Sequence, residues 1–176
     1  MKFVIYHENC SDGMGAAWAA YKMYGDDTNI IQYIPTSNRL ELPDAVLARS
    51  VEDLKDDEVY FLDFCLPAGV LLDLEAKVKL LVVLDHHASV KSDIESVQHH
   101  VYGTDKSGAY LAWEYFHPNT KVPKLVEYIC DQDLFRHRLP NWQEAIAYIY
   151  DGNIEEKTFK HYDKLSDDLE NDFAKV

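Results

Sequence analysis

The chain has 176 residues, 47% of them hydrophobic, which is long and apolar enough for one compact domain with a sizeable core. Its 31 acidic and 17 basic residues give a formal net charge of −14, and such a surface repels free polyanions. Binding to long duplex DNA is therefore disfavoured, because phosphate contacts need clustered lysine and arginine. Bound metal cations would still let an acidic protein handle phosphates, although solubility alone also explains the charge.

Nothing in the sequence indicates a membrane span or a secretory signal. No apolar run reaches the roughly 18 residues that a span needs, and only a short apolar stretch precedes His7. The three cysteines, Cys10, Cys65 and Cys130, are odd in number and lack the spacing of a disulfide framework. We therefore expect a cytoplasmic protein in a reducing environment, with no membrane partner.

Short apolar runs alternate with helical patterns through the first half of the chain. Residues 2–6 (KFVIY) predict a buried strand, and the alanine-rich residues 13–23 predict a helix. The next predicted elements are a strand at 30–34, a strand at 59–64, a helix at 67–77 and a strand at 80–84. Strands separated by helices favour right-handed crossovers, so we expect an α/β fold with a mostly parallel sheet flanked by helices.

After residue 105 the pattern becomes helical. Helices are predicted at 107–116, 123–130 and 142–150. Asp151-Gly152-Asn153 is a turn signal, and residues 154–173 after it are charged and poor in apolar positions, so we expect them to pack loosely. We expect one domain over residues 1–150 with a helical C-terminal part, followed by a helical tail or linker remnant over residues 151–176.

Acidic and imidazole residues follow three of the predicted strands. They are His7 and Asp12 after the first strand, Asp63 at the end of the third, and Asp85, His86 and His87 after the fourth. Asp131, at the end of an apolar helical stretch, adds a fourth contribution. Ligands of open parallel sheets bind at the carboxyl ends of the strands, so we expect these side chains to gather at one edge.

Carboxylate and imidazole groups together suit Mn²⁺, Fe²⁺, Co²⁺ or Zn²⁺. A carboxylate can bridge two such cations and hold them roughly 3.5–4 Å apart. Taken singly, each residue has a plainer explanation: Asp63 as a helix cap or turn residue, His7 as a core histidine, Asp131 as a surface charge. Because four separate segments supply matching ligands at the predicted strand ends, the joint pattern favours a metal site.

Four segments together resemble the motifs of the DHH phosphoesterase superfamily, which includes RecJ-like nucleases, oligoribonucleases, exopolyphosphatases and family II pyrophosphatases. They are VIYHENCSDGMGAAWAA, VYFLDF, VVLDHHAS and YICDQDLF, in the family's order over roughly residues 1–150. The Asp-His-His triplet after an apolar strand is the most specific element. The resemblance implies a catalytic domain with a site for one or two Mn²⁺ ions, with Mg²⁺, Co²⁺ or Zn²⁺ as alternatives.

The same resemblance implies a role for each residue. His7 matches the histidine of the first metal, and Asp63 matches the bridging aspartate. His87 matches the phosphate-contacting histidine, and Asp85 is expected to orient a ring as its partner. The second metal would be held by a set of three residues, which are Asp12, His86 and Asp131.

Cys10 departs from the family pattern, because it stands where the first aspartate of an Asp-x-Asp pair is expected. Three outcomes are open. The first metal site is weak or empty, or the Cys10 thiolate binds a softer metal such as Zn²⁺, or the neighbouring Asn9 supplies an oxygen. All three cysteines neighbour the metal motifs, yet buried cysteine is also a common small apolar filler near strand ends.

A second departure concerns substrate binding. Most relatives carry a further C-terminal domain with basic residues and a glycine-rich segment, and no such segment occurs here. We expect either a minimal catalytic domain or a chain for which a partner or a second copy supplies the substrate-binding residues. Ser107, in a Ser-Gly-Ala segment that resembles one near the family's site, and Arg136 are the expected substrate contacts, although a helix cap and a solvated loop explain them equally simply.

The leading hypothesis is therefore hydrolysis of a phosphoester or phosphoanhydride bond in a small nucleotide-type or short oligonucleotide substrate. The expected catalytic residues form a short list: Asp63, Asp85, His86 and His87. The alternative is a module of the same fold, with one metal or none, that binds a nucleotide or a protein without turnover. A zinc or redox sensor that uses the cysteines is a third option.

Overall fold

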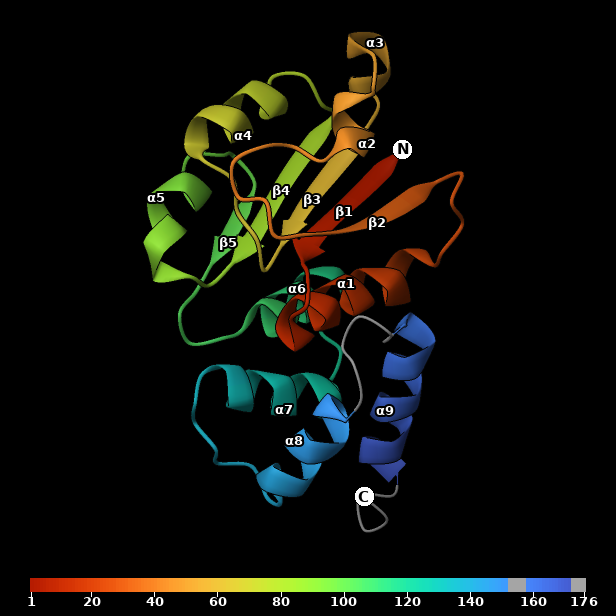
Figure 1. Ribbon diagram of the computed structural model, residues 1–176, viewed down its shortest axis with the longest axis vertical. Helices are drawn as coiled ribbons and strands as arrows, with labels where there is room; N and C mark the ends of the chain where they lie inside the picture. Colours follow the sequence, from red (N-terminus) through yellow and green to blue (C-terminus); the bar gives the residue numbers. More distant parts are fainter. Residues whose placement is uncertain (152–157, 172–176) are drawn as a thin grey trace.

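The protein, described here by a computed structural model over residues 1–151 and 158–171, is built around a five-stranded sheet in which every pairing is parallel (Figure 1). The strands are β1 (Lys2–His7), β2 (Ile31–Thr36), β3 (Glu58–Leu62), β4 (Leu80–Asp85) and β5 (His100–Tyr102). Their order across the sheet is β2-β1-β3-β4-β5. In this order the connections reverse direction between β1 and β3, which is where ligands of such sheets bind.

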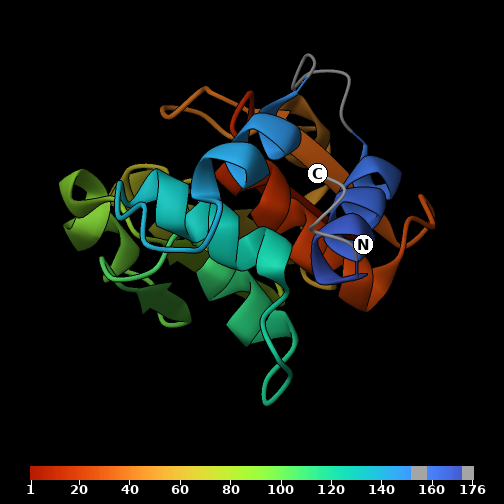
Figure 2. The same ribbon diagram turned by 90° about the horizontal axis from the view of Figure 1, so that it is seen from below.

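Helices cover both faces of the sheet, as the sequence predicted. One face carries short helices and one longer one: α2 (Asp44–Leu47), α3 (Val51–Leu54), α4 (Ala68–Glu75), the 3₁₀ turn η1 (Ala88–Val90) and α5 (Lys91–Ile94). The other face carries α1 (Ser11–Tyr24) and α6 (Gly108–Phe116), with α7 (Lys124–Asp133), α8 (Trp142–Tyr150) and α9 (Phe159–Asn171) beyond them. Seen from below in Figure 2, these last three form a further layer across α1 and α6.

Two hydrophobic clusters follow from this layering, one on each face of the sheet. Alternate residues of β1 point to opposite clusters, with Val4 toward α1 and α6, and Phe3 and Ile5 toward α4 and α5. Every one of these three side chains is almost fully buried. A strand buried on both faces has to be a continuous apolar run, which is why KFVIY identified it from sequence.

The elements that the sequence did not predict are the short ones. β5 has three residues and is largely exposed, and α2, α3 and α5 have four residues each, so none carries a hydrophobic period long enough to recognise. The strand predicted at 59–64 ends earlier, at Leu62. Asp63 terminates it by adopting a left-handed backbone conformation with φ of 53°.

Helix α9 corrects the expectation that the C-terminal segment packs loosely. Tyr162, Leu165 and Leu169 are fully buried and belong to the same cluster as the side chains of α1 and α6. Their spacing of three and four residues forms one apolar stripe, which is sufficient to seat a helix whose other residues are charged. Parts of the predicted turn at 151–153 and of the predicted segment 154–173 lie outside the described residues.

Within the described residues, no helix combines the length and the apolar character needed to cross a membrane.

Candidate metal centre

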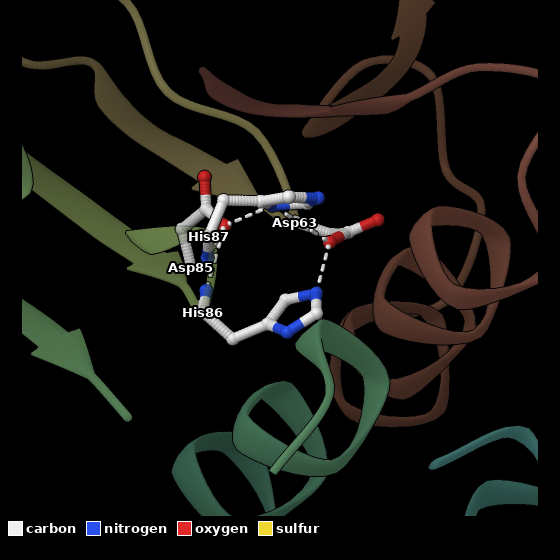
Figure 3. A group of neighbouring side chains, drawn as sticks. All are labelled: Asp63, Asp85, His86 and His87. Atoms are coloured by element: carbon white, nitrogen blue, oxygen red, sulfur yellow. Dashed lines mark hydrogen bonds and ion pairs between the residues drawn. The ribbon is translucent and has the colours of Figure 1, made fainter. Parts of the chain in front are cut away.

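Asp63 is the centre of a cluster at the carboxyl ends of β1, β3 and β4. Its side chain is 1% exposed. One carboxylate oxygen, Oδ2, lies 3.6 Å from His7 Nδ1 and 3.8 Å from Cys10 Sγ. The other, Oδ1, lies 3.3 Å from His86 Nε2 and 3.8 Å from His87 Nδ1. One buried carboxylate therefore faces two separate sets of metal-ligating groups. Figure 3 shows the side of Asp63 that faces His86 and His87.

The backbone at Asp63 is held in an uncommon conformation that the surrounding structure fixes. Its positive φ is costly for a residue with a Cβ. The Asp63 N–H donates to Leu84 O at 2.9 Å, and Gly108 on α6 approaches so closely that a Cβ there would lie 2.4 Å from the Asp63 Cβ. This position needs glycine, because any larger residue would push the carboxylate out of place.

The first set of ligands comes from the β1–α1 connection. One ligand atom each of His7, Cys10 and Asp63 lies within 4.8 Å of the others. Cys10 occupies the N-cap position of α1, where the chain turns from strand into helix. Gly13, in the first turn, has no room for a side chain, since a Cβ would lie 2.2 Å from His7 O. The turn thus presses His7 and Cys10 onto the same side of Asp63.

The second set contains Asp12, His86 and Asp133. His86 Nε2 lies 3.5 Å from Asp12 Oδ2 and 3.5 Å from Asp133 Oδ2. Asp12 is fixed by the N-terminus of α6, where the N–H groups of Gly108 and Ala109 donate to its two oxygens at 2.6 and 2.9 Å. These donors stabilise a buried carboxylate and leave it free to accept a further partner on the His86 side.

Asp85 contacts both histidine residues through one carboxylate oxygen. Its Oδ1 accepts the backbone N–H groups of His86 and His87 at 2.6 and 3.0 Å, and it lies 2.7 Å from His87 Nδ1. Asp85 is fully buried, whereas the His87 side chain is 36% exposed. His87 is therefore the more exposed of the two, with its Nδ1 beside the Asp85 carboxylate (Figure 3).

Several buried polar atoms of the two ligand sets lack a hydrogen-bond partner. They are His7 Nδ1, Asp63 Oδ1, His86 Nε2 and Asp133 Oδ2. Buried polar atoms are nearly always paired in folded proteins, because leaving one unpaired costs about 1–3 kcal/mol. Cations held by the two ligand sets would satisfy these atoms.

Charge coupling within the cluster points to the same conclusion. Burial alone would lower the pKa of His86, but Asp63, Asp12 and Asp133 raise it to about 9. Burial raises the pKa of Asp12 well above its usual range, and the neighbouring Asp63 and Asp133 carboxylates add to that shift. For Asp63, burial is outweighed by His7 and His86, which lower its pKa to about 2. Without a metal, the histidine proton supplies the positive charge that three carboxylates require.

Asp131 is a correction to the sequence prediction. We expected it as a ligand of the second metal, but the structure brings Asp133 to the cluster instead. The Asp131 carboxylate accepts the backbone N–H of Arg138 at 2.9 and 3.1 Å and that of Leu139 at 3.4 Å. It therefore ties down the loop after α7. Both aspartates follow the same apolar stretch, so the motif alone did not distinguish the loop-binding residue from the one in the last helical turn.

The two expected substrate contacts lie outside the cation cluster. Ser107 is fully buried beneath the N-terminus of α6, and its N–H donates to Cys130 Sγ at 3.4 Å. Arg136 is exposed and donates to the backbone carbonyl of Asp105. In this conformation Ser107 supports the Asp12 side of the site, and Arg136 is already engaged by a neighbouring loop. Asn9 is exposed, and the Cys10 sulfur occupies the place beside Asp63.

Comparison with known proteins shows the fold without naming an activity. No family model matches the chain. An uncharacterized protein of Acanthamoeba polyphaga mimivirus is 30% identical over 155 residues, which cover 84% of this chain and 37% of the viral protein. A crystal structure of an uncharacterized protein from Helicobacter pylori superimposes with a TM-score of 0.61 at 18% identity, covering 86% of this chain and 48% of the other. The chain thus spans less than half the length of either relative.

Proposed function

We propose that this chain is a catalytic domain of a metal-dependent phosphoesterase of the DHH type. One observation carries the proposal: the buried Asp63 carboxylate offers one oxygen to His7 and Cys10 and the other to His86. A carboxylate between two ligand sets is the arrangement that holds two cations in phosphoryl-transfer sites. The motifs VYFLDF and VVLDHHAS, which resemble those of the DHH superfamily, supply its central residues.

The residues present fit a divalent cation. Oxygen and imidazole ligands suit Mn²⁺, Co²⁺ or Zn²⁺, and four of these ligands have a buried atom without a hydrogen-bond partner: His7, Asp63, His86 and Asp133. Asp133 takes the place for which Asp131 was expected, so the second set would hold its cation with Asp12, His86 and Asp133. When bound, the cations would supply positive charge that activates water and offsets the charge of the phosphoryl group.

The protein's own groups would position and neutralise the substrate. The hydrogen bond to the Asp85 carboxylate raises the pKa of His87, which favours the protonated ring. A half-exposed imidazolium at the mouth of the site can donate to a phosphoryl oxygen. Asp85, fully buried, fixes which ring nitrogen remains available for that contact.

The acidic surface favours a small substrate. With a net charge of −14, the chain would attract a long polyanion poorly, whereas a nucleotide or a short oligonucleotide carries few phosphates to repel. We therefore propose a small nucleotide-type phosphoester as the substrate. Because the chain spans less than half of either relative, a partner chain or further domain that grips the substrate remains part of this proposal.

Hydrolysis of bis-p-nitrophenyl phosphate tests the activity directly. The metal-stripped protein is assayed with and without added Mn²⁺, together with Asp63→Asn and a matched control, Asp73→Asn, on the exposed face of α4. We expect Mn²⁺-dependent turnover that falls by at least about 10³-fold in Asp63→Asn, as losses of central catalytic groups do, and stays unchanged in Asp73→Asn. Metal binding without turnover of this ester or of short oligonucleotides would favour the binding module instead.

A further inference from the structure

The half of the site around Cys10 differs chemically from the half around Asp133. Every ligand in the second half is a carboxylate oxygen or an imidazole nitrogen. In the first half, a sulfur atom replaces one of the oxygens, and its nearest polar side-chain partner is Asp63 Oδ2 at 3.8 Å. The two halves share Asp63 and should therefore differ in the metals they prefer.

The distances in the first half match those between ligands of a tetrahedral zinc ion. With Zn–S of about 2.3 Å and Zn–N and Zn–O of about 2.0–2.2 Å, tetrahedral angles place sulfur about 3.6 Å from oxygen and nitrogen about 3.4 Å from oxygen. The observed separations are 3.8 Å for Cys10 Sγ to Asp63 Oδ2 and 3.6 Å for His7 Nδ1 to the same oxygen. Small side-chain movements would complete this geometry.

Two further observations point to a ligand between these groups. His7 Nδ1 is buried and has no hydrogen-bond partner, and the Asp63 carboxylate that it faces is 1% exposed. Cys10 lies at the N-cap of the 14-residue helix α1, and because burial and the Asp63 carboxylate raise the pKa of its thiol, loss of the thiol proton would have to accompany cation binding. The sulfur is thus placed where two other ligands already converge.

We infer that His7, Cys10 and Asp63 form a sulfur-containing cation site that selects Zn²⁺ or another thiophilic divalent cation, while the second half keeps the preference for Mn²⁺-like cations. Binding forms a metal–sulfur bond and releases the thiol proton to solvent, so no oxidant or reductant is required. Three protein ligands are the number that catalytic zinc sites use. This inference rests on the proposed metal-binding function of the same site, but it does not depend on hydrolysis.

Cobalt binding tests the inference without any activity assay. The metal-stripped full chain is titrated with Co²⁺ and followed by its near-ultraviolet sulfur-to-cobalt charge-transfer band, and X-ray absorption of the Zn²⁺ form measures the ligand shell. The variants are Cys10→Ser and Cys10→Asp, with Cys65→Ala as the matched control because Cys65 is buried outside the ligand set. Circular dichroism of each variant shows whether it is folded.

We expect the charge-transfer band in the wild type and in Cys65→Ala, its loss in both Cys10 variants, and one sulfur at about 2.3 Å from zinc. In Cys10→Asp, metal preference should shift from Zn²⁺ toward Mn²⁺. Cations bound through nitrogen and oxygen alone would overturn this inference and leave the proposed function standing. A wild-type protein that binds no divalent cation would overturn both.

Discussion

Strand β3 has a buried aspartate beside each of its ends, and the two differ in how far their carboxylates are paired. At the amino end, Asp57 is fully buried and completely paired: Arg49 Nε and Nη2 donate to it at 2.7 and 3.1 Å, and the N-terminal ammonium lies at 2.8 Å. At the carboxyl end, Asp63 is equally buried, yet its neighbours include two carboxylates and several unpaired atoms.

This contrast separates a carboxylate that is paired within the protein from one that is surrounded by unpaired polar atoms. Arg49 and the N-terminal ammonium supply the counter-charges of Asp57, and they lower its pKa although burial alone would raise it. Asp63 sits at the point where the strand order reverses, in a left-handed conformation, among groups that share one kind of partner. Burial alone therefore does not distinguish the two aspartates, whereas the unpaired polar atoms around Asp63 do.

The largest effect on stability should come from the amino end. Asp57→Ala leaves the Arg49 guanidinium without its partner, and breaking a buried pair costs about 3–5 kcal/mol. Because Arg49 is partly exposed, we expect a loss of about 3 kcal/mol, at the lower end of that range. Urea unfolding measures it, with Asp73→Asn expected to stay within about 0.5 kcal/mol. Cation affinity should not change; a large loss of affinity in Asp57→Ala would blur the distinction between the two ends.

A sharper form of the comparison lies within one helix, between Asp131 and Asp133. Asp131→Asn weakens the hold on the backbone N–H groups of Arg138 and Leu139, so we expect a stability loss of about 1–3 kcal/mol with cation affinity retained. Asp133→Asn should do the reverse, with affinity for one cation falling on the order of 10–100-fold. Calorimetric metal titration and urea unfolding of both variants decide this, and a loss of affinity confined to Asp131→Asn would restore the original sequence prediction.

The smallest predicted effect is a pH dependence of the metal-free protein. The folded-state pKa of His86 is raised to about 9 from 6.5, so its contribution to stability is fully present below pH 6.5 and is lost as the pH rises toward 9. Thermal unfolding in chelator should show a midpoint that declines across this range. His86→Asn should flatten that decline, and an unchanged slope in the variant would show that another group is responsible.

The sequence predicted the parts of the fold that rest on long periodic patterns. KFVIY and LLVVL could be recognised as buried strands because both faces of the sheet are covered, so every position is apolar. The fold class and the gathering of His7, Asp63 and His86 at one edge followed from that topology and are confirmed by the structure. Short elements such as β5 carried no comparable signal.

The sequence could not predict which residues of each predicted segment reach the site. The choice between Asp131 and Asp133 depends on where helix α7 ends and how the loop after it turns back over the helix. The burial of Ser107 depends on how closely α6 approaches Asp63, which only Gly108 allows. Both are properties of three-dimensional packing between segments far apart in the chain, and neither leaves a local pattern.

Anomalous scattering from crystals soaked in Mn²⁺, and separately in Zn²⁺, tests the central claim most directly. We predict two peaks roughly 3.5–4 Å apart, one on each side of the Asp63 carboxylate, with His7 and Cys10 at one and His86 and Asp133 at the other. Soaked crystals in which no peak lies within bonding distance of Asp63, while its neighbours keep the arrangement described here, would contradict the account.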